Sequence, residues 1–258
     1  MRAIVLGAGY ATRLRPLTDE VPKQLLPVGG RPILDWIVDK LADAPDLEGI
    51  HVVTNSHYVD RFRSWADERG GVIVHDDGTW TNDDRRGAIG DLAFTLREAE
   101  IDDDLLVIAG DNLFEFGLAD FVAFWAARGV ASAVAVHDVR DLGLASKYGV
   151  VELADDDRVV DFVEKPPEPR STLAATALYL YHREHARLIG PYLADGNPRD
   201  QPGNLVAWLC RREPVYAYQF AGEWFDIGDV GQLLVADNRM RERVGLPRRD
   251  AYALSLQN

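Results

Sequence analysis

The sequence is poor in cysteine, in positive charge and in long apolar runs. Its 258 residues include one cysteine, Cys210, which excludes an internal disulfide framework and a zinc site built from several thiolates. No apolar run approaches the roughly 18 residues of a membrane span. The 28 basic residues against 42 acidic ones, a net charge of −14, argue against an extended surface for nucleic acid. We therefore expect a cytoplasmic protein without nucleic-acid or membrane partners, and a small anionic substrate remains allowed.

The first half of the chain alternates short apolar runs with helical patterns, which is typical of a parallel sheet covered by helices. We expect buried strands at 3–6, 50–54, 72–75 and 105–109. Between them, apolar residues at helical spacing predict helices at 32–41, 58–69 and 88–98. The predicted fold class is therefore α/β, with a doubly wound, mostly parallel (Rossmann-like) central sheet and helices on both faces.

Beyond about residue 130, strands follow one another with shorter connections. The pattern predicts strands at 131–137, 148–153, 159–164, 173–181 and 215–220, and helices at 184–193, 205–211 and from 230 onward. We expect these strands to extend the same sheet as mixed or antiparallel additions. No linker rich in proline, glycine or serine divides the chain, so we predict one domain over 1–245, with halves 1–130 and 131–245 and a tail at 246–258.

The loop after the first strand is the most informative segment. It runs Gly7-Ala8-Gly9-Tyr10-Ala11-Thr12-Arg13 directly after Leu6. Glycines let backbone amides approach a phosphate or a base closely, because no side chain intervenes. Residues 1–31 hold five basic residues against two acidic ones, so the sign of the charge reverses where the glycine loop lies. These features predict an anionic, phosphate-bearing ligand.

A dinucleotide-dependent oxidoreductase is a competing interpretation, because Gly7-Ala8-Gly9 begins the fingerprint of that fold. The fingerprint needs a third small residue where Thr12 stands, then an immediate helix and an acidic residue at the end of the next strand. Here Pro16 interrupts the helix, and the second strand ends in Thr54-Asn55. The sequence therefore disfavours this reading.

The segment from Gly7 to Thr18, followed by Pro22-Lys23-Gln24-Leu25-Leu26-Pro27-Val28, resembles the signature of the sugar-1-phosphate nucleotidyltransferases, also called nucleotide-sugar pyrophosphorylases. Further matches follow in the family's order over most of the chain: Gly110-Asp111-Asn112, Tyr148 to Glu152, Glu164-Lys165-Pro166 and Trp224 to Gly228. The residues of these motifs are most similar to those of the thymidylyltransferase branch, which acts on glucose-1-phosphate. Ala11 and Ala177 stand where the family usually has glycine.

The resemblance implies a role for each matching position. Nucleotide contacts are implied for Leu6, Gly7, Ala8, Gly9, Tyr10, Ala11, Thr12, Arg13, Lys23 and Asp111. Sugar-phosphate contacts are implied for Gly149, Glu164, Lys165 and Thr176, and catalytic roles for Arg13, Lys23 and Lys165. The first half, 1–130, would thus bind the nucleotide and the second, 131–245, the sugar phosphate.

Asp111 and Asp226 are the predicted metal ligands. Asp111 follows a buried strand, at the edge where open parallel sheets bind ligands. Two carboxylates together with phosphate oxygens suit Mg²⁺, and the resemblance implies the same two positions. Taken alone, an aspartate after a strand is more often a helix cap or a turn former.

The segment from Asp76 to Asp91 replaces the loop in which the family uses a glutamine and a glycine to contact the base. We expect Gly87 to provide a backbone contact there. Asp83 and Asp84 fit a solvated loop, and Trp80 fits either a loop anchor or a stacking platform. The sequence leaves the base open.

The predicted reaction joins a nucleoside triphosphate and a sugar-1-phosphate to give an NDP-sugar and pyrophosphate, with dTTP and glucose-1-phosphate as the first expectation. A cytidylyltransferase or another transferase acting on a different sugar or alcohol phosphate, such as phosphocholine, is the first alternative. A non-catalytic nucleotide-binding regulatory module is the alternative of another class. The sequence also leaves open whether the protein is a homo-oligomer.

Overall fold

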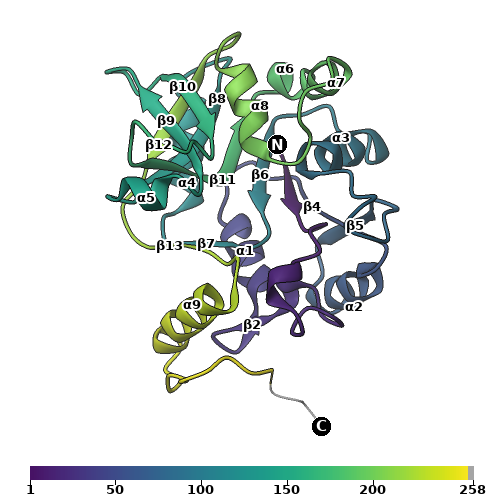
Figure 1. Cartoon of the computed structure of the whole chain (residues 1–258). Helices are drawn as coiled ribbons and strands as arrows, with labels where there is room; N and C mark the ends of the chain where they lie inside the picture. Colours follow the sequence, from purple (N-terminus) through teal and green to yellow (C-terminus); the bar gives the residue numbers. More distant parts are fainter. Residues whose placement is uncertain (255–258) are drawn as a thin grey trace.

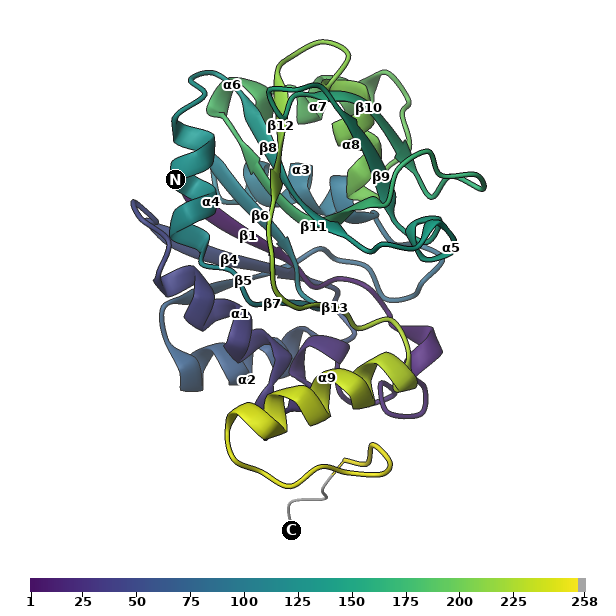
Figure 2. The same cartoon turned by 90° about the vertical axis from the view of Figure 1, so that its left-hand side faces the viewer.

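The computed structural model describes residues 1–254 and contains a branched mixed sheet with helices on both faces (Figures 1 and 2). The first half supplies β1 (Arg2–Leu6), β4 (Gly49–Thr54), β5 (Val72–Asp76) and β6 (Leu105–Ala109). These strands are parallel and lie in the order β6-β1-β4-β5. The predicted parallel half of the sheet is confirmed, and each boundary agrees to within one residue.

The second half adds the antiparallel strands that were expected. The strand β11 (Leu173–Tyr181) pairs antiparallel with β6, and both β8 (Ser132–Asp138) and β9 (Gly149–Leu153) pair with β11, so the sheet branches there. The outer strands are β10 (Val159–Glu164), antiparallel to β9, and β12 (Val215–Gln219), parallel to β8. The predicted fold class is therefore confirmed.

Two short strand pairs lie outside the main sheet. The first joins β2 (Pro27–Val28) to β3 (Arg31–Pro32), and the second joins β7 (Asn112–Phe114) to β13 (Trp224–Asp226). Because β7 and β13 are three residues long and distant in sequence, the apolar pattern did not predict their pairing. This second pair connects the two halves beside the carboxyl end of β6 (Figure 2).

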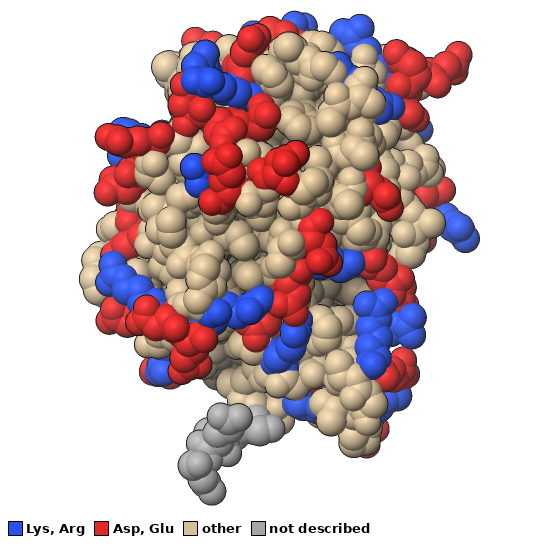
Figure 3. All heavy atoms as spheres, turned by 180° about the vertical axis from the view of Figure 1, so that it is seen from behind, with Lys and Arg blue, Asp and Glu red and all other residues tan. Residues whose placement is uncertain are grey.

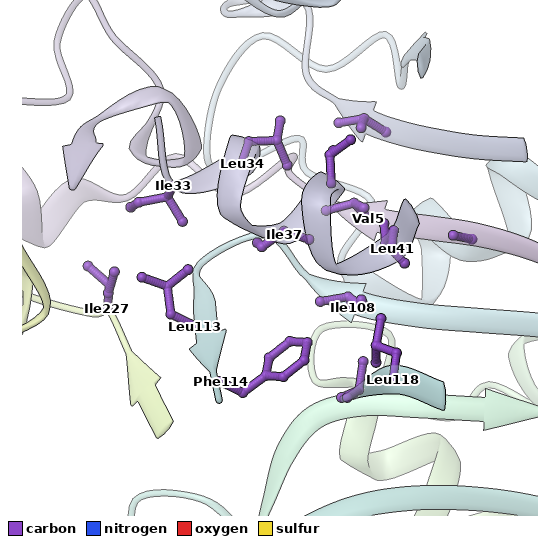
Figure 4. Packing of buried hydrophobic residues seen from close by; sticks show 14 of the residues in the cluster. Val5, Ile33, Leu34, Ile37, Leu41, Ile108, Leu113, Phe114, Leu118 and Ile227 are labelled. Atoms are coloured by element: carbon purple, nitrogen blue, oxygen red, sulfur yellow. The ribbon is translucent and has the colours of Figure 1, made fainter. Parts of the chain in front are cut away.

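The alternation of side chains along the strands divides the core into two layers. Ala3 and Val5 of β1 face the layer that contains α1 (Ile33–Ala42), α2 (Val59–Arg69), α4 (Leu118–Ala126) and α9 (Val230–Arg243). Ile4 faces the layer that contains α3 (Ala88–Glu98), α7 (Ile189–Ala194) and α8 (Pro202–Leu209). Figure 4 shows the first layer, in which Ile37 and Leu41 lie near Ile108. Each fully buried side chain of this size contributes about 1.5–3 kcal/mol.

The helix predicted over 184–193 is wrong as a single element. The structure has two short helices there, α6 (Arg183–Ala186) and α7. Pro191 explains the break, because it has no amide hydrogen to continue a helix from the preceding turn. The remaining short elements are α5 (Leu142–Ala145) and the 3₁₀ turns η1 (Thr12–Leu14) and η2 (Lys23–Leu25).

The predicted tail at 246–258 is described only as far as residue 254. In this part the Tyr252 hydroxyl donates to the carbonyl of Pro27 at 2.8 Å, and the amide of Arg249 donates to Asn238 Oδ1 at 2.7 Å. The last four residues of the predicted tail lie outside the described residues. Among the described helices, none is long and apolar enough to cross a membrane. On the face shown in Figure 3, acidic and basic side chains are intermixed without a continuous basic band.

Candidate active site

A cleft of about 850 Å³ begins at the carboxyl ends of β1 and β6 and continues over β9, β10 and β11. Both halves of the chain therefore line it. Its walls include most of the predicted site residues: Leu6, Ala8, Gly9, Ala11, Arg13, Lys23, Gly87, Asp111, Gly149, Glu164, Lys165, Thr176 and Asp226. Three residues predicted to contact the nucleotide, Gly7, Tyr10 and Thr12, are not on its walls.

Two of these residues, Gly7 and Tyr10, support the glycine loop from behind. The amide of Gly7 donates to the carbonyl of Val53 at 2.8 Å, and a Cβ on Gly7 would lie 3.0 Å from the same oxygen. Gly7 is thus required by the close approach of β4, and its amide is not free for a phosphate. The hydroxyl of Tyr10 is hydrogen-bonded to Thr79 at 3.1 Å, and Thr12 is exposed at the start of η1.

The open part of the loop lies between Gly9 and Arg13. Gly9 is exposed, and a Cβ there would meet nothing within 4 Å. Ala11 has a left-handed backbone, with φ of 45°, which turns the chain into η1 and toward Arg13. Asn55, which the sequence analysis did not select, donates from Nδ2 to the carbonyl of Ala8 at 2.9 Å and fixes the loop to the end of β4. Within residues 1–254, Arg13 forms no salt bridge, so its charge is available to a ligand.

The two predicted metal ligands lie side by side because β7 pairs with β13. In that register Asp226 lies opposite Asn112, the residue after Asp111. The amide of Ile227 also donates to the carbonyl of Asp111 at 3.1 Å. Over a hundred residues of sequence separate the two aspartates, so a three-residue strand pair decides their geometry.

The carboxylates share this region with basic side chains. Burial alone would raise the pKa of Asp111, but the ammonium of Lys23, which is ion-paired and hydrogen-bonded to it, outweighs burial and lowers the pKa. Burial and the charge of Asp111 raise the pKa of Asp226. The groups that oppose this rise are Lys23, Arg13 and Lys165. Three cations therefore surround two adjacent carboxylates.

This donor set fits a magnesium ion whose remaining ligands come from the substrate. Asp111 and Asp226 offer hard oxygen ligands, and Asp111 Oδ1 is oriented by a hydrogen bond from Asn112 Nδ2 at 2.8 Å. Across the described part of the chain, no group of three or more His, Cys, Asp or Glu side chains could hold a metal alone. Mg²⁺ commonly binds one or two carboxylates and takes its other oxygens from water and phosphates.

The sugar-phosphate side is built around Glu164 at the end of β10. Its Oε2 lies against Gly149 and Gly203, where a Cβ on Gly149 would come within 3.0 Å of it. No hydrogen bond is donated to this carboxylate by any residue from 1 to 254, and burial raises its pKa against the opposing charge of Lys165. Lys165 is exposed, and its amide donates to the carbonyl of Tyr148 at 3.0 Å. An unpartnered carboxylate beside a free ammonium can bind hydroxyls and a phosphate together.

Thr176 lies on an irregular part of β11. The register with β8 shifts between Ala175 and Tyr179, and Ala177 has a left-handed backbone with φ of 53°. The Thr176 hydroxyl donates to the carbonyl of Ala135 at 3.0 Å, so toward a ligand it can act only as an acceptor. The bulge thus explains why glycine is usual at the position of Ala177.

The loop at 77–87 closes the other end of the cleft and is docked on the chain before α8. A Cβ on Gly87, whose φ is 79°, would lie 2.6 Å from the carbonyl of Arg199. The guanidinium of Arg85 forms a 3.0 Å ion pair with Asp200. These contacts join the two halves across the cleft, although both members of the ion pair are partly exposed.

The acidic residues of this loop are not all merely solvated. Asp84 Oδ1 accepts hydrogen bonds from the amide and the hydroxyl of Thr81 at 2.8 and 3.0 Å, which stabilises the turn. Trp80 is 64% exposed and is not on the cleft walls. The cleft is also lined by residues that no sequence signal selected: Asn82, Arg85, Asp91, Lys147, Tyr179, Asp200, Gln201 and Gly203.

The distribution of charge defines the class of protein. Free cations on a glycine loop and across the cleft, opposite paired carboxylates, are suited to a triphosphate and its metal ion. The nucleotidyl transferase family model matches residues 2–243, and the chain belongs to that family.

Two curated relatives match most of this chain. The bifunctional protein GlmU of Methanocaldococcus jannaschii is 29% identical over 95% of this chain and 55% of its own length. The UTP–glucose-1-phosphate uridylyltransferase AglF of Haloferax volcanii is 34% identical over 70% of this chain and 72% of its own. The chain thus spans little more than half of the first of these relatives.

Solved structures agree with the fold. A protein from Bacillus anthracis, provisionally assigned as a glucose-1-phosphate thymidylyltransferase, superposes with a TM-score of 0.77 at 25% identity and covers 94% of this chain and 96% of its own. A UDP-glucose pyrophosphorylase superposes with a TM-score of 0.78 over 94% of this chain; at 20% identity it supports the fold alone.

Proposed function

We propose that this protein transfers a thymidylyl group from dTTP to glucose-1-phosphate, giving dTDP-glucose and pyrophosphate with Mg²⁺ as the metal. The observation that carries the proposal is the convergence of Arg13, Lys23 and Lys165 on the carboxylates of Asp111 and Asp226. This arrangement supports a reaction in which two anionic substrates meet. The resemblance to the thymidylyltransferase branch supports the choice of dTTP. Because a relative such as AglF is named for UTP, the identity of the base is tested separately from the reaction class.

In this proposal the sugar phosphate is the nucleophile. One of its oxygens forms a bond to the α-phosphorus of the triphosphate, and the bond from that phosphorus to the bridging oxygen of pyrophosphate breaks. A phosphate oxygen is already anionic at neutral pH, so no general base is required. Catalysis then consists of positioning and charge neutralisation.

Each cation has its own task. Lys165 directs the attacking phosphate oxygen toward the α-phosphorus, and Lys23 lies beside Asp111 where charge accumulates on that phosphorus. Arg13, with the amides of the exposed part of the glycine loop, binds the departing pyrophosphate.

On the acceptor side, Glu164 has the partner-free oxygens that sugar hydroxyls need, and Thr176 adds an acceptor. Asp111 and Asp226 would hold Mg²⁺, which when bound neutralises phosphate charge and acts as a Lewis acid.

The test is pyrophosphate release with Mg²⁺ over a grid of the nucleoside triphosphates against several sugar-1-phosphates, with choline phosphate included. We expect the highest rate with dTTP and glucose-1-phosphate. A higher rate with CTP and choline phosphate would replace the substrates and keep the class. Triphosphate binding without pyrophosphate release from any pair would support a binding module and overturn the proposal.

A further inference from the structure

Asp91 is a buried carboxyl group on the cleft wall that the mechanism above does not use. It lies in the first turn of α3 and is 5% exposed. Its Oδ1 is fully buried and has no hydrogen-bond partner. No side chain or amide of residues 1–254 donates to either of its carboxyl oxygens, whereas its backbone carbonyl accepts from the Thr95 hydroxyl. Acidic residues commonly occupy the first turn of a helix, where they interact favourably with its dipole, so position alone does not distinguish Asp91.

A second buried carboxyl group, Asp77, lies next to it. Asp77 is 1% exposed, and its Oδ1 accepts hydrogen bonds from the amide and the hydroxyl of Thr79, both at 2.7 Å. Its Oδ2 is buried and has no partner. The Asp77 and Asp91 side chains are within hydrogen-bonding reach of each other. A single proton shared between them satisfies both unpartnered oxygens, and we refer to the two residues as the acid pair.

Charges around the acid pair agree with a shared proton. Burial, followed by the charge and hydrogen bond of Asp77, raises the pKa of Asp91 to about 8. The other charged groups that act on Asp91 are Arg86, which lowers its pKa, and Asp200, which raises it. Among residues 1–254, Arg86 forms no ion pair with either carboxyl group, and its Nε donates instead to the backbone carbonyl of Asp77 at 2.6 Å.

The location of the acid pair indicates which part of a nucleotide it meets. A buried acid disfavours phosphate, and the free cations Arg13 and Lys165 lie elsewhere on the cleft walls. Asp91 instead shares its end of the cleft with Gly87 at the start of α3, and its amide donates to the carbonyl of Gly87 at 2.8 Å. The loop from Asp77 to Gly87 is tied to the glycine loop by the hydrogen bond between Tyr10 and Thr79. A nucleotide whose phosphates lie on the glycine loop therefore directs its base toward Asp91.

We propose that Asp91 selects the nucleobase by accepting a hydrogen bond from a ring N–H, and thereby favours uracil, thymine and guanine over cytosine and adenine. This inference rests on the proposed nucleotidyl transfer. The shared proton is directed at Asp77, so the other oxygen of Asp91 presents an acceptor to the cleft. Uracil and thymine at N3, and guanine at N1, carry a hydrogen that this oxygen can accept.

The disfavoured bases lack that hydrogen. Cytosine at N3 and adenine at N1 present a lone pair, so that two acceptors, the ring nitrogen and the Asp91 oxygen, would face each other. To bind them, Asp91 would have to turn its proton toward the base and leave the buried Oδ2 of Asp77 without a partner. An unsatisfied buried acceptor of this kind lowers affinity by about 10- to 100-fold.

The experiment compares kcat/KM and equilibrium affinity, measured by calorimetry, for UTP, dTTP, GTP, CTP and ATP in four proteins. The wild type should prefer the first three. Asp91→Asn should keep this preference, because its amide nitrogen can donate to Asp77 while its carbonyl oxygen faces the base. Asp91→Leu should reduce the preference by about 10- to 100-fold. Asp83→Asn, which removes an exposed charge from the same loop, is the matched control.

Asp91→Ala provides the same comparison with a smaller side chain if the leucine variant does not fold. Retention of the wild-type preference in the alanine or leucine variant would overturn base selection by Asp91, as would a wild type that binds CTP as well as UTP. These outcomes leave nucleotidyl transfer intact. Absence of turnover with every triphosphate would overturn the proposed function, while the calorimetric preferences would still decide the role of Asp91.

Discussion

Gly203 is the position at which a single methyl group should disable sugar-phosphate binding. It lies in the first turn of α8, on the cleft wall, with Glu164 and the ring of Phe162 directly against it. In Gly203→Ala the new Cβ would overlap Glu164 Oε2 and lie 2.8 Å from the Phe162 ring. The Phe162 ring is buried, so the flexible carboxylate is the group that must move first.

The expected effect follows from that overlap. Restoring ordinary contact requires the Glu164 carboxylate to retreat by roughly 1.5 Å, and a misplacement of about 1 Å in a binding group reduces rates by about 100-fold. We therefore expect kcat/KM for the sugar-1-phosphate to fall by about 100-fold, with the KM for the triphosphate within about twofold. Pressure on Phe162 should lower the free energy of unfolding by about 1–3 kcal/mol.

Steady-state kinetics with each substrate varied in turn, together with thermal unfolding, measures these effects. Gly190→Ala is the matched control, since Gly190 is also helical but nothing lies within 4 Å of its added Cβ. In a Glu164→Ala background, Gly203→Ala should add little to the loss, because the two changes act on the same group. A folded Gly203→Ala protein with the wild-type KM and kcat for the sugar phosphate would refute the assigned position of Glu164.

Three further predictions concern the cations and the acid pair. Arg13→Ala and Lys23→Ala should each lose orders of magnitude in turnover while staying folded. Arg15→Ala is the control, because Arg15 is in the same loop but off the cleft walls, and its rate should stay near that of the wild type. Near-normal rates in both Arg13→Ala and Lys23→Ala would refute the mechanism. Because folding raises the pKa of Asp91 to about 8, its contribution to stability is full below pH about 4 and is lost as pH rises through about 8. Urea unfolding across this range should show a stability that falls with pH in the wild type and a flatter profile in Asp91→Asn, and parallel profiles would contradict the shared proton. Arg85→Ala should change stability by less than about 1 kcal/mol, since its ion pair is exposed. The same change should raise the KM for the triphosphate several-fold by loosening the loop at 77–87, and an unchanged KM would show that the ion pair does not hold this loop.

The sequence predicted the parallel half of the sheet well because its signals are local. Buried strands such as 105–109 are short apolar runs, and the helix at 88–98 has continuous helical spacing, so both could be placed to the residue. The elements that were predicted wrongly or missed also have local physical causes. Pro191 divides a helix whose apolar spacing is otherwise continuous, and β7 and β13 are too short to carry a pattern.

Most of the site could be predicted because its residues matched the family signature. Lys23, Asp111 and Lys165 were found in this way, and the cleft includes all three. Asp91 and Gly203 were missed because the significance of each depends on a residue on another element of the same half, namely Asp77 for Asp91 and Glu164 for Gly203. For Gly7 the prediction erred in the opposite direction. Glycine is needed at this position because the chain packs against Val53, and a glycine pattern cannot distinguish such packing from contact with a ligand.

Left-handed backbone at non-glycine positions explains how adjacent residues can serve one cleft. Ala11, Lys165 and Ala177 have φ values of 45°, 48° and 53°, and all three lie on the cleft walls. In a regular strand, neighbouring side chains point to opposite faces, so Glu164 and Lys165 could not both reach the same ligand. The left-handed turn at Lys165 removes that restriction, and the bulge at Ala177 does the same for Thr176. Each such residue costs roughly 1 kcal/mol or more, and the fold retains this strain at the points where the chain must change direction to bring these groups together.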